Sequence, residues 1–106
     1  MDVIISNLIN LIQQIDKIKS HFHIVPRIGF PSLNIIYDVP EFSNWKQELQ
    51  FLLQGIYDRT KDKFVRDLLV LLKQGFNGWR DEESFNELAG GLLAISKNID
   101  KYFSEK

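Results

Sequence analysis

The first twenty residues alternate apolar and polar positions with the spacing of an amphipathic helix. Apolar side chains recur at steps of three and four residues, which places them along one side of a helix. This stripe consists of Ile4, Leu8, Leu11, Ile15, Ile18 and Phe22. A second apolar stripe lies beside it, and the polar positions are mostly Ser, Asn and Gln rather than charged residues. We therefore predict a helix over residues 2–22 that is either central to a bundle or part of a subunit interface.

The helical pattern stops in the segment 23–38. Pro26, Gly29 and Pro31 disfavour a regular helix there. Residues 33–37 are apolar and partly β-branched, so they could be extended, but no other stretch of the chain shows a strand pattern to pair with them. The segment is therefore predicted to be an ordered crossover that packs on the helices, longer than most helix–helix connections.

Three further helices are predicted over residues 39–57, 60–74 and 82–103. Asp38 is the candidate N-cap of the first of these, with Pro40 in its first turn and Glu41 in a capping-box position. Asp58 to Thr60 indicate a tight turn or kink. Gly91 falls in line with the apolar residues of the last helix, which indicates close approach of another helix, and the first helix is the best candidate. The pattern as a whole predicts one all-α domain over residues 1–106, like a four-helix bundle, whose terminal helices are antiparallel.

Charge and composition narrow the class of protein. The 106 residues include 13 Lys and Arg against 14 Asp and Glu, so the net charge is −1 and nothing favours long-range attraction to nucleic acid or anionic membranes. The densest basic stretch, residues 59–66, is interleaved with aspartates. The apolar N-terminal run is interrupted by polar residues and begins with Asp2, unlike a signal peptide or a membrane span. Because the chain also has no Cys, we expect a cytoplasmic protein without disulfides.

Motifs for catalysis or metal binding are missing from the chain. The two histidines, His21 and His23, would point in opposite directions on a helix, and no third or fourth metal ligand has the required spacing. Nucleophile elbows, phosphate loops and paired zinc motifs are also missing. The acidic residues fall mostly off the apolar stripes, which is typical of a solvated face. We therefore predict a protein that is not an enzyme and has no catalytic residue, metal or cofactor.

Aromatic residues are more numerous than a small helical core obviously needs. The chain has 8 Phe, 3 Tyr and 2 Trp, and the predicted core accommodates Phe42, Trp45, Phe64 and Phe85. Other aromatic residues lie off the stripes or in the crossover: Phe30, Tyr37, Phe51, Phe76 and Trp79. Two interpretations remain open, because the crossover could cover this surplus or leave it exposed as a patch for a partner.

These observations favour a protein–protein interaction module: a small adaptor, an immunity-type protein or an inhibitor that also self-associates. The residues predicted to bind the partner are Phe30, Tyr37, Trp79 and Arg80, because Trp, Tyr and Arg commonly anchor interfaces. The alternative is a protein that binds a nucleotide or nucleotide signal where the crossover meets the bundle. In that hypothesis Arg27 would hold an anion, and Tyr37 or Trp45 would stack on the base.

Overall fold

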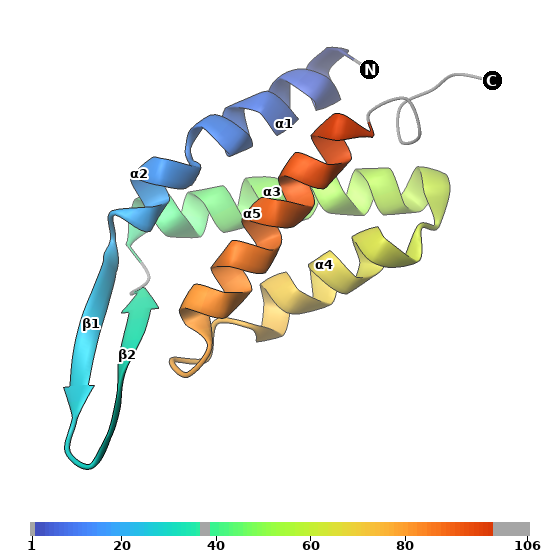
Figure 1. Cartoon of the computed structure of the whole chain (residues 1–106). Coiled ribbons are helices and arrows are strands. Elements are labelled where there is room, and N and C mark those ends of the chain that lie inside the picture. The colour runs from blue at the N-terminus through green and yellow to red at the C-terminus, as the bar shows by residue number, and fades with distance from the viewer. Residues whose placement is uncertain (1, 37–38, 99–106) are drawn as a thin grey trace.

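The protein is a helical body from which a two-stranded hairpin projects at one end (Figure 1). The computed structural model describes residues 2–36 and 39–98. Its helices are α1 (Asp2–Gln13), α2 (Ile15–Lys19), α3 (Pro40–Thr60), α4 (Lys63–Gln74) and α5 (Asp81–Lys97), and its strands are β1 (Phe22–Arg27) and β2 (Phe30–Ile36). None of the helices in these residues combines the length and hydropathy needed to span a membrane.

The prediction of an all-α, four-helix bundle-like fold is wrong. The segment expected to be a crossover forms an antiparallel β-hairpin, so the fold combines helices with a two-stranded sheet. Phe22 pairs with Ile36, and the ladder continues through His23 with Ile35 to Val25 with Leu33. Residues 33–36 are extended, as their composition allowed, and the partner strand that the pattern did not reveal is the segment directly before the turn.

Proline and glycine placement explains how this segment can be a hairpin. Arg27 pairs with Phe30, so Ile28 and Gly29 form a two-residue turn, and Gly29 at its second central position has a φ of 77°, a left-handed conformation that glycine adopts without steric cost. The register shifts between Val25 and Arg27. Pro26 lies in that irregular step, where its missing N–H removes no regular ladder bond.

The first helix is interrupted, in contrast to the continuous helix predicted over residues 2–22. Helix α1 ends at Gln13 and α2 runs from Ile15 to Lys19. The indole N–H of Trp45 in α3 donates a hydrogen bond of 3.1 Å to the Leu11 carbonyl in the last turn of α1. A side-chain donor that reaches a helix carbonyl is a recognised cause of a local break. The chain after Ser20 turns into β1.

The boundaries of the other helices differ from the prediction mainly at one turn. Helix α3 continues through the residues expected to form a turn, Asp58 to Thr60, and its C-cap is Lys61, whose φ of 54° is left-handed. Asp62 then caps α4, since its carboxylate accepts the backbone N–H groups of Phe64 and Val65. Helix α5 begins at Asp81, one residue before its predicted start, and residues 99–103 and the predicted cap Asp38 lie outside the described residues.

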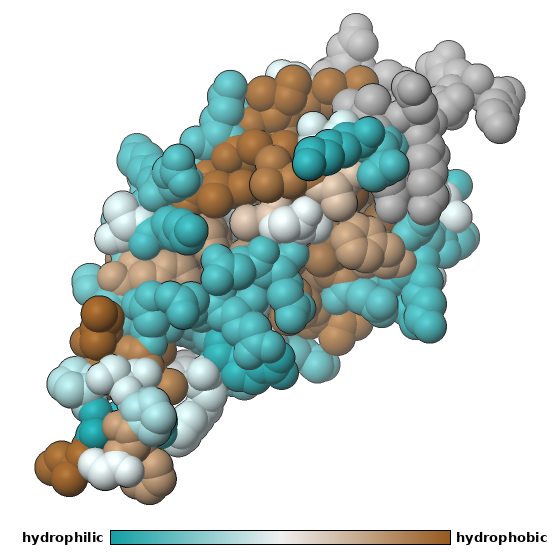
Figure 2. All heavy atoms as spheres, viewed as in Figure 1, coloured by the Kyte–Doolittle hydropathy of each residue, from teal (hydrophilic) through white to brown (hydrophobic). Residues whose placement is uncertain are grey.

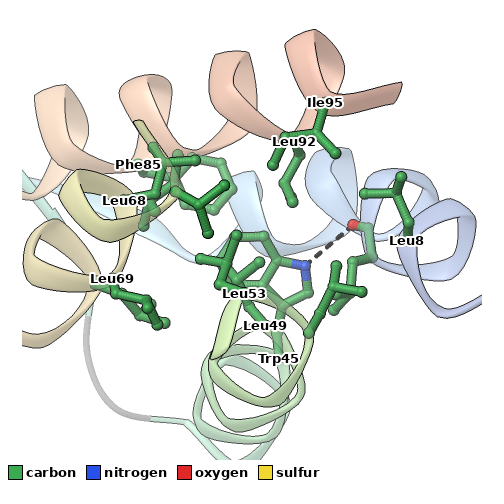
Figure 3. Packing of buried hydrophobic residues seen from close by; sticks show 14 of the residues in the cluster. Leu8, Trp45, Leu49, Leu53, Leu68, Leu69, Phe85, Leu92 and Ile95 are labelled. Carbon is green, nitrogen blue, oxygen red and sulfur yellow. Dashed lines mark hydrogen bonds between the residues drawn. The ribbon is translucent and has the colours of Figure 1, made fainter. Parts of the chain in front are cut away.

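The core lies between the helices and is centred on Trp45 and Phe85 (Figure 3). Phe42 is fully buried as well and packs near Trp45. Helices α1 and α5 pack together and run in opposite directions, as predicted (Figure 1). The helix that approaches Gly91 closely is α4, whereas the first helix was expected there. A Cβ at position 91 would lie 2.7 Å from both Cδ atoms of Leu68 in α4. Phe64, which was assigned to the core, is 41% exposed.

Candidate interaction surface

The exposed aromatic residues of the hairpin and of the α4–α5 loop meet around one arginine. The Arg27 guanidinium lies 5.3 Å from the ring centroid of Phe30 and 5.2 Å from that of Trp79. Its Nε donates a hydrogen bond of 3.0 Å to the Pro31 carbonyl, which fixes its direction. We call Arg27, Ile28, Phe30 and Trp79 the hairpin patch.

The hairpin patch presents large apolar side chains to solvent. Ile28 is fully exposed, Phe30 is 68% exposed and Trp79 is 65% exposed. Figure 2 shows brown, hydrophobic atoms at the far end of the hairpin. Monomeric proteins commonly expose single apolar residues, whereas several large ones gathered at one projecting end make that end a candidate contact surface.

The loop between α4 and α5 holds Trp79 in a defined position. The side chain of Asn77 accepts hydrogen bonds from the backbone N–H groups of Trp79 and Arg80, at 2.9 and 3.3 Å. This is an Asx turn, which Asn favours. Gly78 follows with a positive φ of 86°. Trp79 therefore projects to solvent from a turn that hydrogen bonds hold in one conformation.

Asp81 connects this loop to the hairpin. The residue is 3% exposed, and its carboxylate accepts the backbone N–H of Gly78 at 2.9 Å and that of Ile36 at 3.2 Å. One side chain at the start of α5 thus sets the position of the loop that carries Trp79 relative to β2. Beside it, the Asn34 side chain donates to Glu82. The two elements that form the hairpin patch are consequently joined at their bases.

Arg80 is adjacent to the patch, but its charge is engaged elsewhere. Its guanidinium makes two contacts with the Glu83 carboxylate, at 2.6 and 3.2 Å. This pair raises the pKa of Arg80 and lowers the pKa of Glu83, chiefly through the hydrogen bonds between them. Arg27 is therefore the cation that the hairpin patch presents, a role that the sequence interpretation gave to Arg80.

Of the residues predicted to bind a nucleotide, Arg27 and Trp45 do not come together, and Tyr37 lies outside the described residues. Trp45 is fully buried in the core, where it packs near Phe42 and Phe85, so no face of its ring is open to a base. A small cavity of about 210 Å³ does lie where the hairpin meets the helices. It is lined by Lys19, Phe22, Asn34, Glu82, Phe85 and Asn86. This volume is below that of common small-molecule sites, and neither Arg27 nor Trp45 lines it.

Of the four residues predicted to bind a partner, Phe30 and Trp79 meet in the patch and Arg80 lies beside it, whereas Tyr37 lies outside the described residues. Ile28 was missed, because Ile-Gly is not one of the pairs, such as Asn-Gly or Asp-Gly, that signal a two-residue hairpin turn in a sequence. Within residues 2–36 and 39–98, no three His, Asp or Glu side chains are close enough together to hold a metal ion.

Comparison with known proteins gives no relative from which a role could be transferred: no family model, curated protein or solved structure matches this chain.

Proposed function

We propose that this protein is a non-enzymatic interaction module that binds another protein through the hairpin patch. The observation that carries the proposal is the placement of the Arg27 guanidinium between the Phe30 and Trp79 rings on a projecting, exposed surface. Aromatic residues and arginine are the side chains that most often dominate binding energy at interfaces. Adaptor, immunity-type and inhibitor roles all use such a surface.

Pre-organisation supports this function. Cation–π contacts and the hydrogen bond to Pro31 hold the three side chains together before any partner is present. A surface whose side chains are already ordered loses less conformational entropy on binding, which leaves more of the contact energy as affinity. The partner surface that fits would offer an apolar pocket for the rings and an acceptor for the remaining Arg27 N–H groups.

A cytoplasmic location is part of the proposal. It is supported by the absence of Cys, because small domains in oxidising compartments commonly rely on disulfides.

The test compares partner binding by the wild type, by Phe30→Ala/Trp79→Ala and by the control Phe51→Ala. Phe51 is 78% exposed on α3, so the control removes an exposed aromatic ring elsewhere. A protein captured specifically by the wild type is purified, and its dissociation constant is measured for all three chains. We expect the double variant to bind at least about 30-fold more weakly, equivalent to about 2 kcal/mol, and Phe51→Ala to bind like the wild type. Equal affinity of the double variant and the wild type would exclude the patch as the binding surface.

A further inference from the structure

The Arg27 guanidinium has hydrogen-bond donors that the described residues leave unused. Its Nε donates to the Pro31 carbonyl, and the ring centroids of Phe30 and Trp79 lie 5.3 and 5.2 Å from the guanidinium carbon. Its terminal Nη1 and Nη2 groups make no hydrogen bond or ion pair within residues 2–36 and 39–98. We propose that the partner presents an Asp or Glu carboxylate to these terminal groups, an inference that rests on the proposed function.

The charges around the hairpin leave Arg27 available to a partner. The segment 22–36 contains Arg27 and neither Asp nor Glu. The carboxylates at the start of α5, next to the loop of the hairpin patch, are already engaged. Asp81 accepts two backbone N–H groups, Glu82 accepts a side-chain amide from β2, and Glu83 is paired with the arginine before α5. Arg27 therefore presents a positive charge that no carboxylate of the described residues compensates.

The shape and charge of the guanidinium favour a carboxylate as its acceptor. The planar N–H groups of an arginine match the two oxygens of a carboxylate, and such charge-assisted hydrogen bonds are about twice as strong as neutral ones. Arg27 is half-buried, so part of the water that would hydrate its charge is already displaced. A backbone carbonyl would leave that charge uncompensated. A phosphate group carries about two negative charges at pH 7, whereas Arg27 is the one cation of the hairpin patch.

The apolar residues of the hairpin patch determine what lies beside the carboxylate in the partner. Ile28 is fully exposed, and Phe30 and Trp79 keep about two thirds of their surface in solvent. Because both rings lie next to the guanidinium, the apolar side chains that cover them must be close to the acidic residue that Arg27 binds. Their contact also excludes water from the ion pair, which strengthens it. The partner site is therefore an Asp or Glu side chain with large apolar side chains around it.

Phenylacetate tests this chemistry, because it joins a carboxylate to an apolar ring, and phenylacetamide is its neutral counterpart. The isotope-labelled full chain is titrated with each compound at constant ionic strength, and NMR follows the Arg27 Nε–H and the Trp79 indole N–H. We expect phenylacetate to bind with a dissociation constant about threefold or more below that of phenylacetamide. In Arg27→Gln, followed at Trp79, the two compounds should bind alike. Equal binding of both compounds by the wild type would overturn the proposal, and so would no binding of phenylacetate up to about 100 mM.

The partner protein purified in the test of the proposed function extends the experiment. Arg27→Gln should bind it about tenfold or more weakly than the wild type does. Arg66→Gln removes the same charge from an exposed position on α4 and should bind like the wild type. Changing the partner's acidic residue at the contact to its amide should weaken binding by the wild type and leave that by Arg27→Gln unchanged.

The variants distinguish a failure of this inference from a failure of the proposed function. If Phe30→Ala/Trp79→Ala weakens binding while Arg27→Gln binds like the wild type, the hairpin patch remains the binding surface and the carboxylate is excluded. If neither variant weakens binding, the proposed function itself fails.

Discussion

At the scale of single residues, Asp81 shows how one buried carboxylate can place a surface that it does not itself form. It accepts one backbone N–H from the α4–α5 loop and one from β2. Asp81 is only 3% exposed, and its bond with Ile36 is buried whereas its bond with Gly78 is part-buried. A negative side chain in the first turn of a helix is also favoured by the helix dipole. The residue therefore serves the helix, the loop and the hairpin together.

We expect Asp81→Ala to lower the free energy of unfolding by about 2 kcal/mol or more, because two backbone donors lose their acceptor. Chemical denaturation monitored by circular dichroism measures this change. Asp81→Asn keeps one acceptor oxygen and should fall between the wild type and Asp81→Ala. If Asp81→Ala unfolded at the same denaturant concentration as the wild type, the link between loop and hairpin would be energetically unimportant.

At the scale of elements, an ion-pair cluster joins α2 to the start of α3. The Glu41 carboxylate contacts His21 at 2.7 Å and the Lys17 ammonium at 3.0 Å. The hydrogen bond from His21, followed by that from Lys17, lowers the pKa of Glu41 below its ordinary value of 4.5. The contacts therefore favour the ionised carboxylate in the folded protein.

This lowered pKa predicts how stability depends on pH. A carboxyl whose pKa is lower when folded stabilises the protein fully above its unfolded pKa, and loses that contribution as pH falls through the folded value. The stability difference between the wild type and Glu41→Gln should therefore be largest near about pH 6 and shrink toward about pH 3. Thermal unfolding across this range measures it. Glu48→Gln on the same helix is the control, and a Glu41→Gln difference that stays constant across the range would contradict the prediction.

The hairpin is the part of the fold that could not be predicted from the sequence. Helical spacing identifies most of the helical residues because each stripe is a local pattern. Strand β1 has no such signal: its exposure alternates only weakly, and Pro26 lies inside it. Its pairing with β2 depends on the turn at Ile28 and Gly29. That turn can be identified in the sequence only if the segments before and after it are already assumed to be strands.

The hairpin patch could be predicted only in part for a similar reason. Phe30 and Trp79 were identified because they lie outside the apolar stripes of the helices. Their meeting around Arg27 could not be foreseen, since the two aromatic residues are far apart in the chain and are brought together by the hairpin and by the Asp81 contacts. For Trp45 the prediction was wrong, because this residue was proposed to bind a ligand and is instead fully buried in the core.

At the scale of the whole molecule, the helical body and the hairpin are stabilised in different ways. The helices supply nearly all of the buried hydrophobic residues, whereas Ile36 alone is buried in the two strands. A two-stranded hairpin is only marginally stable in water by itself. The hairpin is held at its base, where Phe22 packs on Phe85 and Ile36 donates to Asp81.

The two parts should therefore open with different free energies, which hydrogen exchange measures. Because the Ile36 N–H points to Asp81 and away from β1, the alternate pairs carry the cross-strand bonds, among them Val25 with Leu33. We expect the amides of Val25 and Leu33 to exchange through local opening, many times faster than those of Leu49 and Leu53 in α3, which require global unfolding. Equal protection of all four amides would mean that the hairpin unfolds only with the core. Faster exchange at Val25 and Leu33 would mean that the far end of the hairpin, and the Arg27 and Phe30 side chains it carries, can adjust to a partner while the helices stay folded.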